Sequence, residues 1–176
     1  MKRALMLLAC AICLVSAACY QGHGLDPLTA AEETSGISGT ITFSGEWPDS
    51  TKEVRVAAFT TYPTGIKDKD SLLVYTLNAL ATGQLFFGDT IPRNSAHYDY
   101  LLDLPRGRYE WVLVVWFPDT DNYIMGVKEI GFYRQTATNT MQTVRVMPAT
   151  ISPGIDMTAD FKHVHNNSPF IGRDEK

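Results

Sequence analysis

The amino-acid sequence predicts an all-β fold, an antiparallel β-sandwich of about seven to nine strands. Three observations support this prediction. Apolar and polar residues alternate over several short segments, turns that contain Gly or Pro separate these segments, and no long segment shows the 3.6-residue period of an amphipathic helix. Alternation with a period of two gives a strand one buried face and one solvated face, which suits two sheets packed face to face.

The clearest strands lie at the two ends of the predicted domain. In residues 37–44, Ile37, Ile41 and Phe43 alternate with Ser and Thr, and residues 155–162 repeat the pattern with an Asp, Thr or Lys at each second position. Residues 54–59 form another short strand. Residues 109–117 are apolar on nearly both faces, which predicts a strand in the centre of a sheet.

The middle of the sequence is harder to interpret. Residues 71–80 are apolar and suit either a strand or a helix, and the run Val74, Tyr75 and Thr76 favours a strand. Residues 85–87 resemble a second short strand. In the connection that follows Pro105, Gly107 is expected to supply a positive φ before Tyr109 begins the core face.

The N-terminus has the pattern of a secretory signal. Lys2 and Arg3 precede an apolar run over residues 4–15, and small residues at 16–18 lie just before Cys19. The run is shorter than the roughly 20 residues that a membrane-spanning helix needs. No later segment is longer, so we expect no transmembrane helix in the mature protein.

The segment from Val15 to Cys19 resembles a bacterial lipobox, although Ser16 stands where Leu is usual. The resemblance implies cleavage before Cys19 and a covalent lipid on that residue, and all three cysteines lie in this N-terminal part. The alternative is an ordinary secretory signal cut near Ala18. The expected organisation is therefore a signal peptide (1–18), a lipidated Cys with a flexible tether (19–35), a β-sandwich (36–162) and a polar tail (163–176).

Charge and cysteine content restrict the function. Removal of Lys2 and Arg3 from the 15 basic residues leaves 13, against 19 acidic residues, and the mature sequence has no run of Lys and Arg. Nucleic-acid binding is therefore not expected. We expect a bacterial cell-envelope protein held to a membrane by its lipid. Tyr20, which is not Asp, favours the outer membrane or cell surface by resemblance to proteobacterial sorting signals.

Three segments resemble bacterial carboxypeptidase-regulatory-like domains, which have a transthyretin-like (prealbumin-like) sandwich. They are residues 39–41 followed by 54–59, residues 100–109, and the closing strand 154–161, with sequence Gly-Ile-Asp-Met-Thr-Ala-Asp-Phe. The resemblance implies an immunoglobulin-like sandwich over about residues 36–162. The segment from Ile66 to Ser95 is longer than the usual insertion in that family, so its topology is left open.

Aromatic residues near turns are candidates for ligand binding. Trp47 and Tyr123 are the candidates for stacking on a sugar, because exposed rings can stack on sugars and several families with similar sandwiches bind polysaccharide. Trp111 is expected in the core on the face of Tyr109. Trp116 is expected in the core on the opposite face.

Two pairs of residues have the chemistry of metal ligands. His163 and His165 would share one face of a strand, but no third ligand lies at a recognisable spacing, and a solvated strand end is the alternative. Asp119 and Asp121 suit a hard cation, but they lack the Gly and distal Glu of an EF-hand, and a plain turn is the alternative. We expect no bound metal and no cofactor apart from the lipid.

Catalytic constellations are not evident. His97, beside Tyr98 and Asp99, is the candidate base, but residues 97–104 alternate like a strand, which would point these neighbours to opposite faces. No Gly-x-Ser-x-Gly elbow is present, and the Tyr-Arg-Gly-Ser signature of transthyretin-like hydrolases is absent. The leading hypothesis is a non-catalytic, lipid-anchored module that binds an envelope protein or acts as an accessory subunit. The alternatives are a carbohydrate-binding surface lipoprotein and, third, a hydrolytic enzyme.

Overall fold

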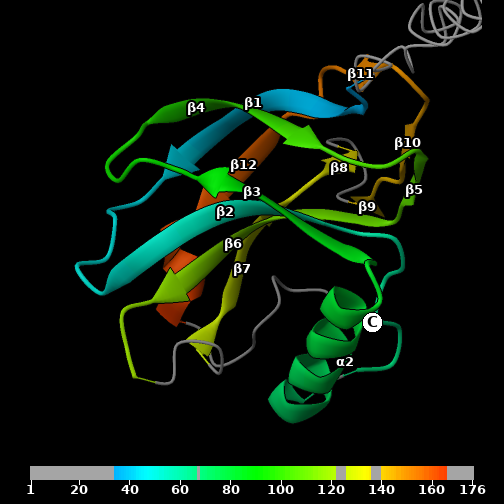
Figure 1. Cartoon of the computed structure of the whole chain (residues 1–176). Helices are drawn as coiled ribbons and strands as arrows, with labels where there is room; N and C mark the ends of the chain where they lie inside the picture. The colour runs from blue at the N-terminus through cyan, green and yellow to red at the C-terminus, as the bar shows by residue number, and fades with distance from the viewer. Residues whose placement is uncertain (1–33, 67, 122–125, 136–139, 166–176) are drawn as a thin grey trace, which may run out of the picture. The chain divides into compact units, whose positions relative to one another are not determined.

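The computed structural model describes residues 34–66, 68–121, 126–135 and 140–165. These residues form a strand-rich domain with one α-helix, and two four-stranded sheets pack face to face (Figure 1). The predicted all-β sandwich is confirmed.

The first sheet is built around β1 (Gly36–Ser44), and the second sheet is fully antiparallel. β4 (His97–Asp103) pairs with one edge of β1, and β11 (Ile151–Ser152) and β12 (Met157–Asp160) pair with the other. The second sheet has the order β3 (Leu85–Thr90), β2 (Thr51–Phe59), β6 (Trp111–Pro118) and β7 (Lys128–Phe132).

Several very short elements complete the described domain. β5 (Gly107–Tyr109) pairs with β10 (Val144–Val146), β8 (Arg134–Gln135) pairs with β9 (Thr140–Met141), and the 3₁₀-helix η2 (Phe161–His165) follows β12. These two- and three-residue strands are too short to show alternation in a sequence. They raise the number of strands above the predicted seven to nine.

The first sheet is mixed, whereas the sequence predicted purely antiparallel pairing. β1 runs parallel to both β11 and β12, with Ile41 opposite Met157 and Ser44 opposite Asp160. Since β1 opens the domain and β12 closes it, all the intervening chain forms the connection between these two parallel neighbours. The predicted alternation in the closing strand is confirmed, because Met157 and Ala159 are buried.

The sandwich core lies between the two sheets. β6 is central, between β2 and β7, as its two apolar faces predicted. Trp116 is buried in this core, where its indole N–H donates to the Thr51 hydroxyl at 2.9 Å. The buried residues of the core are Ile37, Ile41, Val54, Val56, Ala58, Ile91, Tyr100, Leu102, Leu104, Tyr109, Val112, Val114, Trp116, Ile130, Val144, Val146, Ile155, Met157, Ala159 and Phe161.

The preference for a strand over residues 71–80 is wrong: these residues belong to helix α2 (Lys69–Ala81). The Asp68 carboxylate caps its N-terminus by accepting the Ser71 N–H at 2.8 Å. At the other end Gly83 has a φ of +66°, and the Gln84 N–H donates to the Ala79 carbonyl at 2.7 Å. This is a Schellman C-cap, so both helix ends are specified locally and override the β-propensity of the interior.

The connection between β4 and β6 also differs from expectation. Gly107 is not in the left-handed region; it is the first residue of β5 and pairs with Val146. The chain is instead tied back by Tyr109, whose hydroxyl donates to the Pro105 carbonyl at 2.8 Å. Because Glu110 separates β5 from β6, Tyr109 enters the sandwich core while Trp111 packs on the opposite face of the second sheet.

The close packing of β7 on β12 gives a test of this fold. A Cβ on Gly131 would lie 2.3 Å from the Thr158 carbonyl oxygen, so Gly131→Ala should destabilise the domain by about 1–3 kcal/mol. A Cβ on Gly88 would lie at least 3.6 Å from every atom outside the adjacent residues, so this position has room for a methyl group. Urea unfolding should show a lower free energy of unfolding for Gly131→Ala than for the control Gly88→Ala. Equal stability of the two variants would contradict this packing.

Candidate functional site

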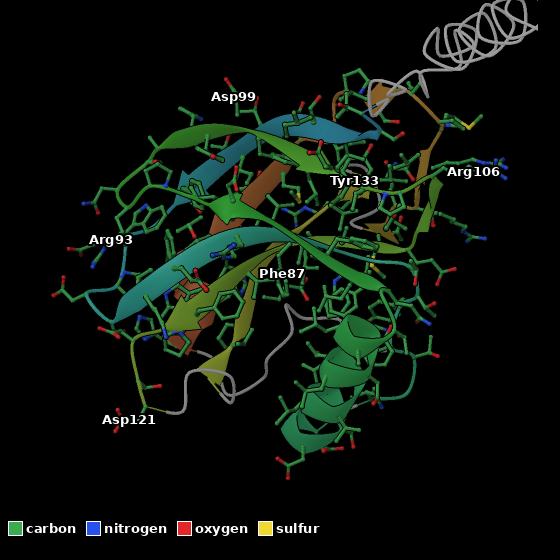
Figure 2. The ribbon with its side chains drawn as sticks, viewed as in Figure 1. Phe87, Arg93, Asp99, Arg106, Asp121 and Tyr133 are labelled. Carbon is green, nitrogen blue, oxygen red and sulfur yellow. The ribbon has the colours of Figure 1, made fainter. Side chains whose placement is uncertain are left out.

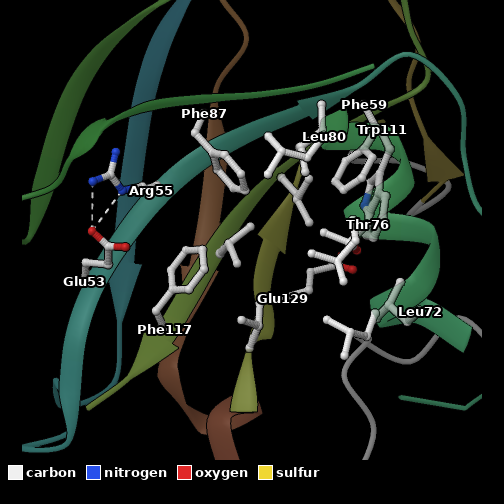
Figure 3. A pocket seen from close by; sticks show the side chains of 16 residues that line it. Glu53, Arg55, Phe59, Leu72, Thr76, Leu80, Phe87, Trp111, Phe117 and Glu129 are labelled. Atoms are coloured by element: carbon white, nitrogen blue, oxygen red, sulfur yellow. Dashed lines mark hydrogen bonds and ion pairs between the residues drawn. The ribbon is translucent and has the colours of Figure 1, made fainter. Parts of the chain in front are cut away.

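A groove lies between α2 and the face of the second sheet that points away from the sandwich core (Figure 3). Its cavity has a volume of about 320 Å³, at the lower end of the range for small-molecule sites. Helix and sheet side chains form its two walls: Leu72, Leu73, Thr76, Leu77 and Leu80 from α2, and Phe59, Leu85, Phe87, Trp111, Leu113, Val115, Phe117 and Val127 from the strands and their flanks.

Aromatic contacts hold the helix over one end of the sheet. Phe59 stacks on Trp111, with ring centroids 4.7 Å apart, and on Tyr75 of α2 at 5.8 Å. The Tyr75 hydroxyl donates to the Thr61 carbonyl, which ties α2 to the end of β2. Burial, and secondarily the negative charge of Glu110, raise the pKa of Tyr75, so this hydroxyl stays a donor at neutral pH.

Three charged side chains line the groove, those of Glu53, Arg55 and Glu129. Arg55 and Glu53 form an ion pair at 2.9 Å, and Arg55 also donates to the Gly88 carbonyl at 3.0 Å. Figure 3 shows this pair on the side remote from α2. Glu129 of β7 also lines the cavity, where it lies opposite Val115 and is only 4 % exposed.

Exposed apolar side chains gather around the groove. Among the described residues, six large hydrophobic side chains are exposed, and four of them are on α2 or β3: Val74, Leu77, Leu80 and Phe87. Leu77, Leu80 and Phe87 line the cavity, whereas Val74 lies outside it. An apolar patch of this kind in a folded domain is characteristic of a binding surface.

Trp47 is not an open platform for a ligand. Its ring packs against Phe43 and Phe161, with centroids at 5.0 and 4.6 Å, and its indole N–H donates to the Ser95 carbonyl at 3.2 Å. It therefore closes one end of the sandwich core. Tyr123, the other aromatic candidate, lies outside the described residues, as does Cys19.

The candidate metal ligands are dispersed. His163 and His165 lie in η2 and not on one face of a strand, because β12 ends at Asp160. Asp119 and Asp121 are exposed at the end of β6. In the part of the chain that the structure describes, no three His, Cys, Asp or Glu side chains come close enough to hold a metal ion.

His97 and Asp99 share the exposed face of β4, each beside a threonine of β1. The Asp99 carboxylate accepts the Thr40 hydroxyl at 2.6 Å, and the His97 ring lies 3.3 Å from the Thr42 hydroxyl. The expected alternation along this strand is confirmed, since Tyr98 points away from this face and packs against the core. The polar ladder links two neighbouring strands on an exposed face.

No family model, no curated protein and no solved structure matches this chain. Within the described residues, none of the helices has the length and hydrophobicity to cross a membrane. The geometry of the groove is therefore the observation on which a function can be argued.

Sequence reasoning missed the groove because it depends on α2. The signal that was available is the helix-capping pattern, with Asp68 before Ser71 and Gly83 after the Leu- and Ala-rich segment. Even a correct helix prediction would not place Phe87 and Phe117 on the same wall, since their strands are separated by β2.

The packing of Trp47 predicts a structural role. Trp47→Ala should lower the free energy of unfolding by roughly 2–4 kcal/mol, because it removes two ring contacts from the end of the core. Leu101→Ala is the control, because Leu101 is 53 % exposed and should change stability by less than about 0.5 kcal/mol. Chemical denaturation measures both; an unchanged stability together with lost glycan binding would instead make Trp47 a ligand contact.

Proposed function

We propose that this protein is a lipid-anchored, non-catalytic binding module of the bacterial cell envelope, and that its groove beside α2 receives an apolar segment of a partner protein. The observation that carries the proposal is the groove itself, an open apolar cavity flanked by exposed Leu77, Leu80 and Phe87. The lipobox-like segment that ends at Cys19 supports the anchored location.

The shape of the apolar surface favours a protein segment over a small ligand. A small-molecule site encloses most of its ligand, whereas here the lining residues Leu77 and Leu80 are 48 % and 52 % exposed. An amphipathic segment can insert two or three apolar side chains into such a groove and cover the exposed residues around it. Glu53 and Arg55 at the groove pair with each other, and the third charged residue that lines the cavity, Glu129, is only 4 % exposed.

The groove can be tested by site-specific photocrosslinking in native membranes. A crosslinker at position 77 should give one discrete protein adduct, whereas one at position 101, on the other sheet, should give none. The adducted protein is then purified and its affinity for this chain is measured directly. A lipid adduct at position 77, or no adduct, would overturn the proposed occupant.

Substitution on the exposed face of α2 gives the quantitative counterpart. Leu77→Asp combined with Leu80→Asp should weaken binding of that purified protein by at least about 30-fold, since each half-exposed leucine contributes about 1 kcal/mol when covered. Leu101→Asp, at a position of equal exposure, should leave the affinity unchanged. Unfolding measurements on all variants separate lost contacts from lost structure.

The anchor is tested separately. Labelled palmitate should be incorporated into the wild-type protein, and Cys19→Ser should abolish the label and release the protein from the membrane fraction. The variant Ser16→Leu, which brings the segment closer to the usual lipobox, should retain the label. A wild-type protein that takes up no label and is recovered outside the membrane fraction would favour the ordinary secretory signal.

A further inference from the structure

Three arginines meet at one end of the sandwich, although they are spread over 40 residues of the sequence. Arg108 of β5 lies directly opposite Arg145 of β10, and Arg106 immediately precedes β5. All three are exposed and line one surface hollow together with Met147. We call these three residues the arginine ribbon.

The arginine ribbon places like charges side by side, which is unfavourable for the stability of the fold. Like charges directly opposite each other on paired strands destabilise the pair. The Glu110 carboxylate lies 3.4 Å from Arg108, and the Arg108 side chain remains 68 % exposed. The ribbon is also positive in a chain whose acidic residues outnumber its basic ones, 19 to 15. Such a local concentration of positive charge is suited to an anionic surface.

The arginine ribbon lies where the described chain begins. The Ser35 carbonyl accepts the Leu104 N–H at 2.9 Å, and its hydroxyl accepts the Ala149 N–H at 3.0 Å. Leu104 lies two residues before Arg106, and Ala149 four residues after Arg145. Figure 2 shows Arg106 at this end of the domain, with Arg93 at the opposite end. Ser35 is thus held by hydrogen bonds to the segment before β5 and to the segment after β10, the two strands that carry Arg108 and Arg145.

The geometry points to the arginine ribbon as a contact surface for anionic phospholipid headgroups of the membrane to which the chain is anchored. This rests on the proposed lipid anchor at Cys19. From Cys19 to Ser35 the chain spans at most about 55 Å, so the anchor would hold this end of the domain within that distance of the headgroups. A guanidinium group can donate two parallel hydrogen bonds to the oxygens of one phosphate. The exposed Met147 beside the arginines suits contact with the acyl chains just below the headgroups.

The contact is tested without the lipid, so that its failure is distinct from failure of the anchor. Both core clusters lie between Ile37 and Val164, so the chain expressed from residue 20 keeps the entire described core. It should cosediment with vesicles that contain equal parts of phosphatidylglycerol and phosphatidylcholine, and not with phosphatidylcholine alone. Added salt should reverse the binding.

Charge removal at the arginine ribbon should weaken this binding stepwise. Arg145→Gln should lower the partition coefficient roughly fivefold, and Arg106→Gln with Arg145→Gln roughly 25-fold. Arg93→Gln, at the opposite end of the domain, should have no effect. Arg145→Gln should also keep or raise the melting temperature, because it relieves the repulsion with Arg108.

Three outcomes would overturn the proposal. One is the absence of binding that depends on phosphatidylglycerol. Another is an equal loss of binding in Arg93→Gln, which would mean diffuse attraction. The third is saturation of the arginine ribbon by inorganic phosphate alone with no vesicle binding, which would identify a soluble phosphate site.

Discussion

The structure depends on a sheet that is apolar on both faces. In β2 and β6, residues of one parity fill the sandwich core, and residues of the other parity form a second cluster that includes Phe59, Trp111 and Leu113. A sheet with two apolar faces needs a cover on each side. The first sheet covers one face, and α2 covers part of the other.

The incomplete cover over the second face accounts for the candidate site. One helix packs over the Trp111 end of the sheet, where Ala79 is buried against it, while Phe87 and the exposed leucines of α2 remain in contact with solvent. A fully covered sheet would have no groove, and an uncovered one would have no second wall. The proposed partner would bury the apolar surface that α2 leaves exposed.

Two buried hydrogen bonds join strands or their flanks, one within each sheet. Trp116 reaches Thr51 at the end of β2, and the Tyr100 hydroxyl donates to the Ile155 carbonyl at 2.7 Å. Burial, with smaller effects from Asp156 and Tyr133, raises the pKa of Tyr100 well above its usual range, so this hydroxyl remains a donor at neutral pH. Each bond satisfies a donor that would otherwise be costly to bury.

Residue patterns by themselves determined the strand content, the central position of residues 111–117 and the inward faces of the first and last strands, because alternation with a period of two is a local property of the chain. They did not determine the helix over residues 69–81, because its interior contains β-branched and aromatic residues and only its caps specify it. Tertiary structure alone decided the parallel pairing of β1 with β12, the core position of Trp47, the groove beside α2 and the meeting of Arg106, Arg108 and Arg145. Each of these joins residues far apart in the sequence, and their proximity is set by how the sheets pack and not by any local periodicity.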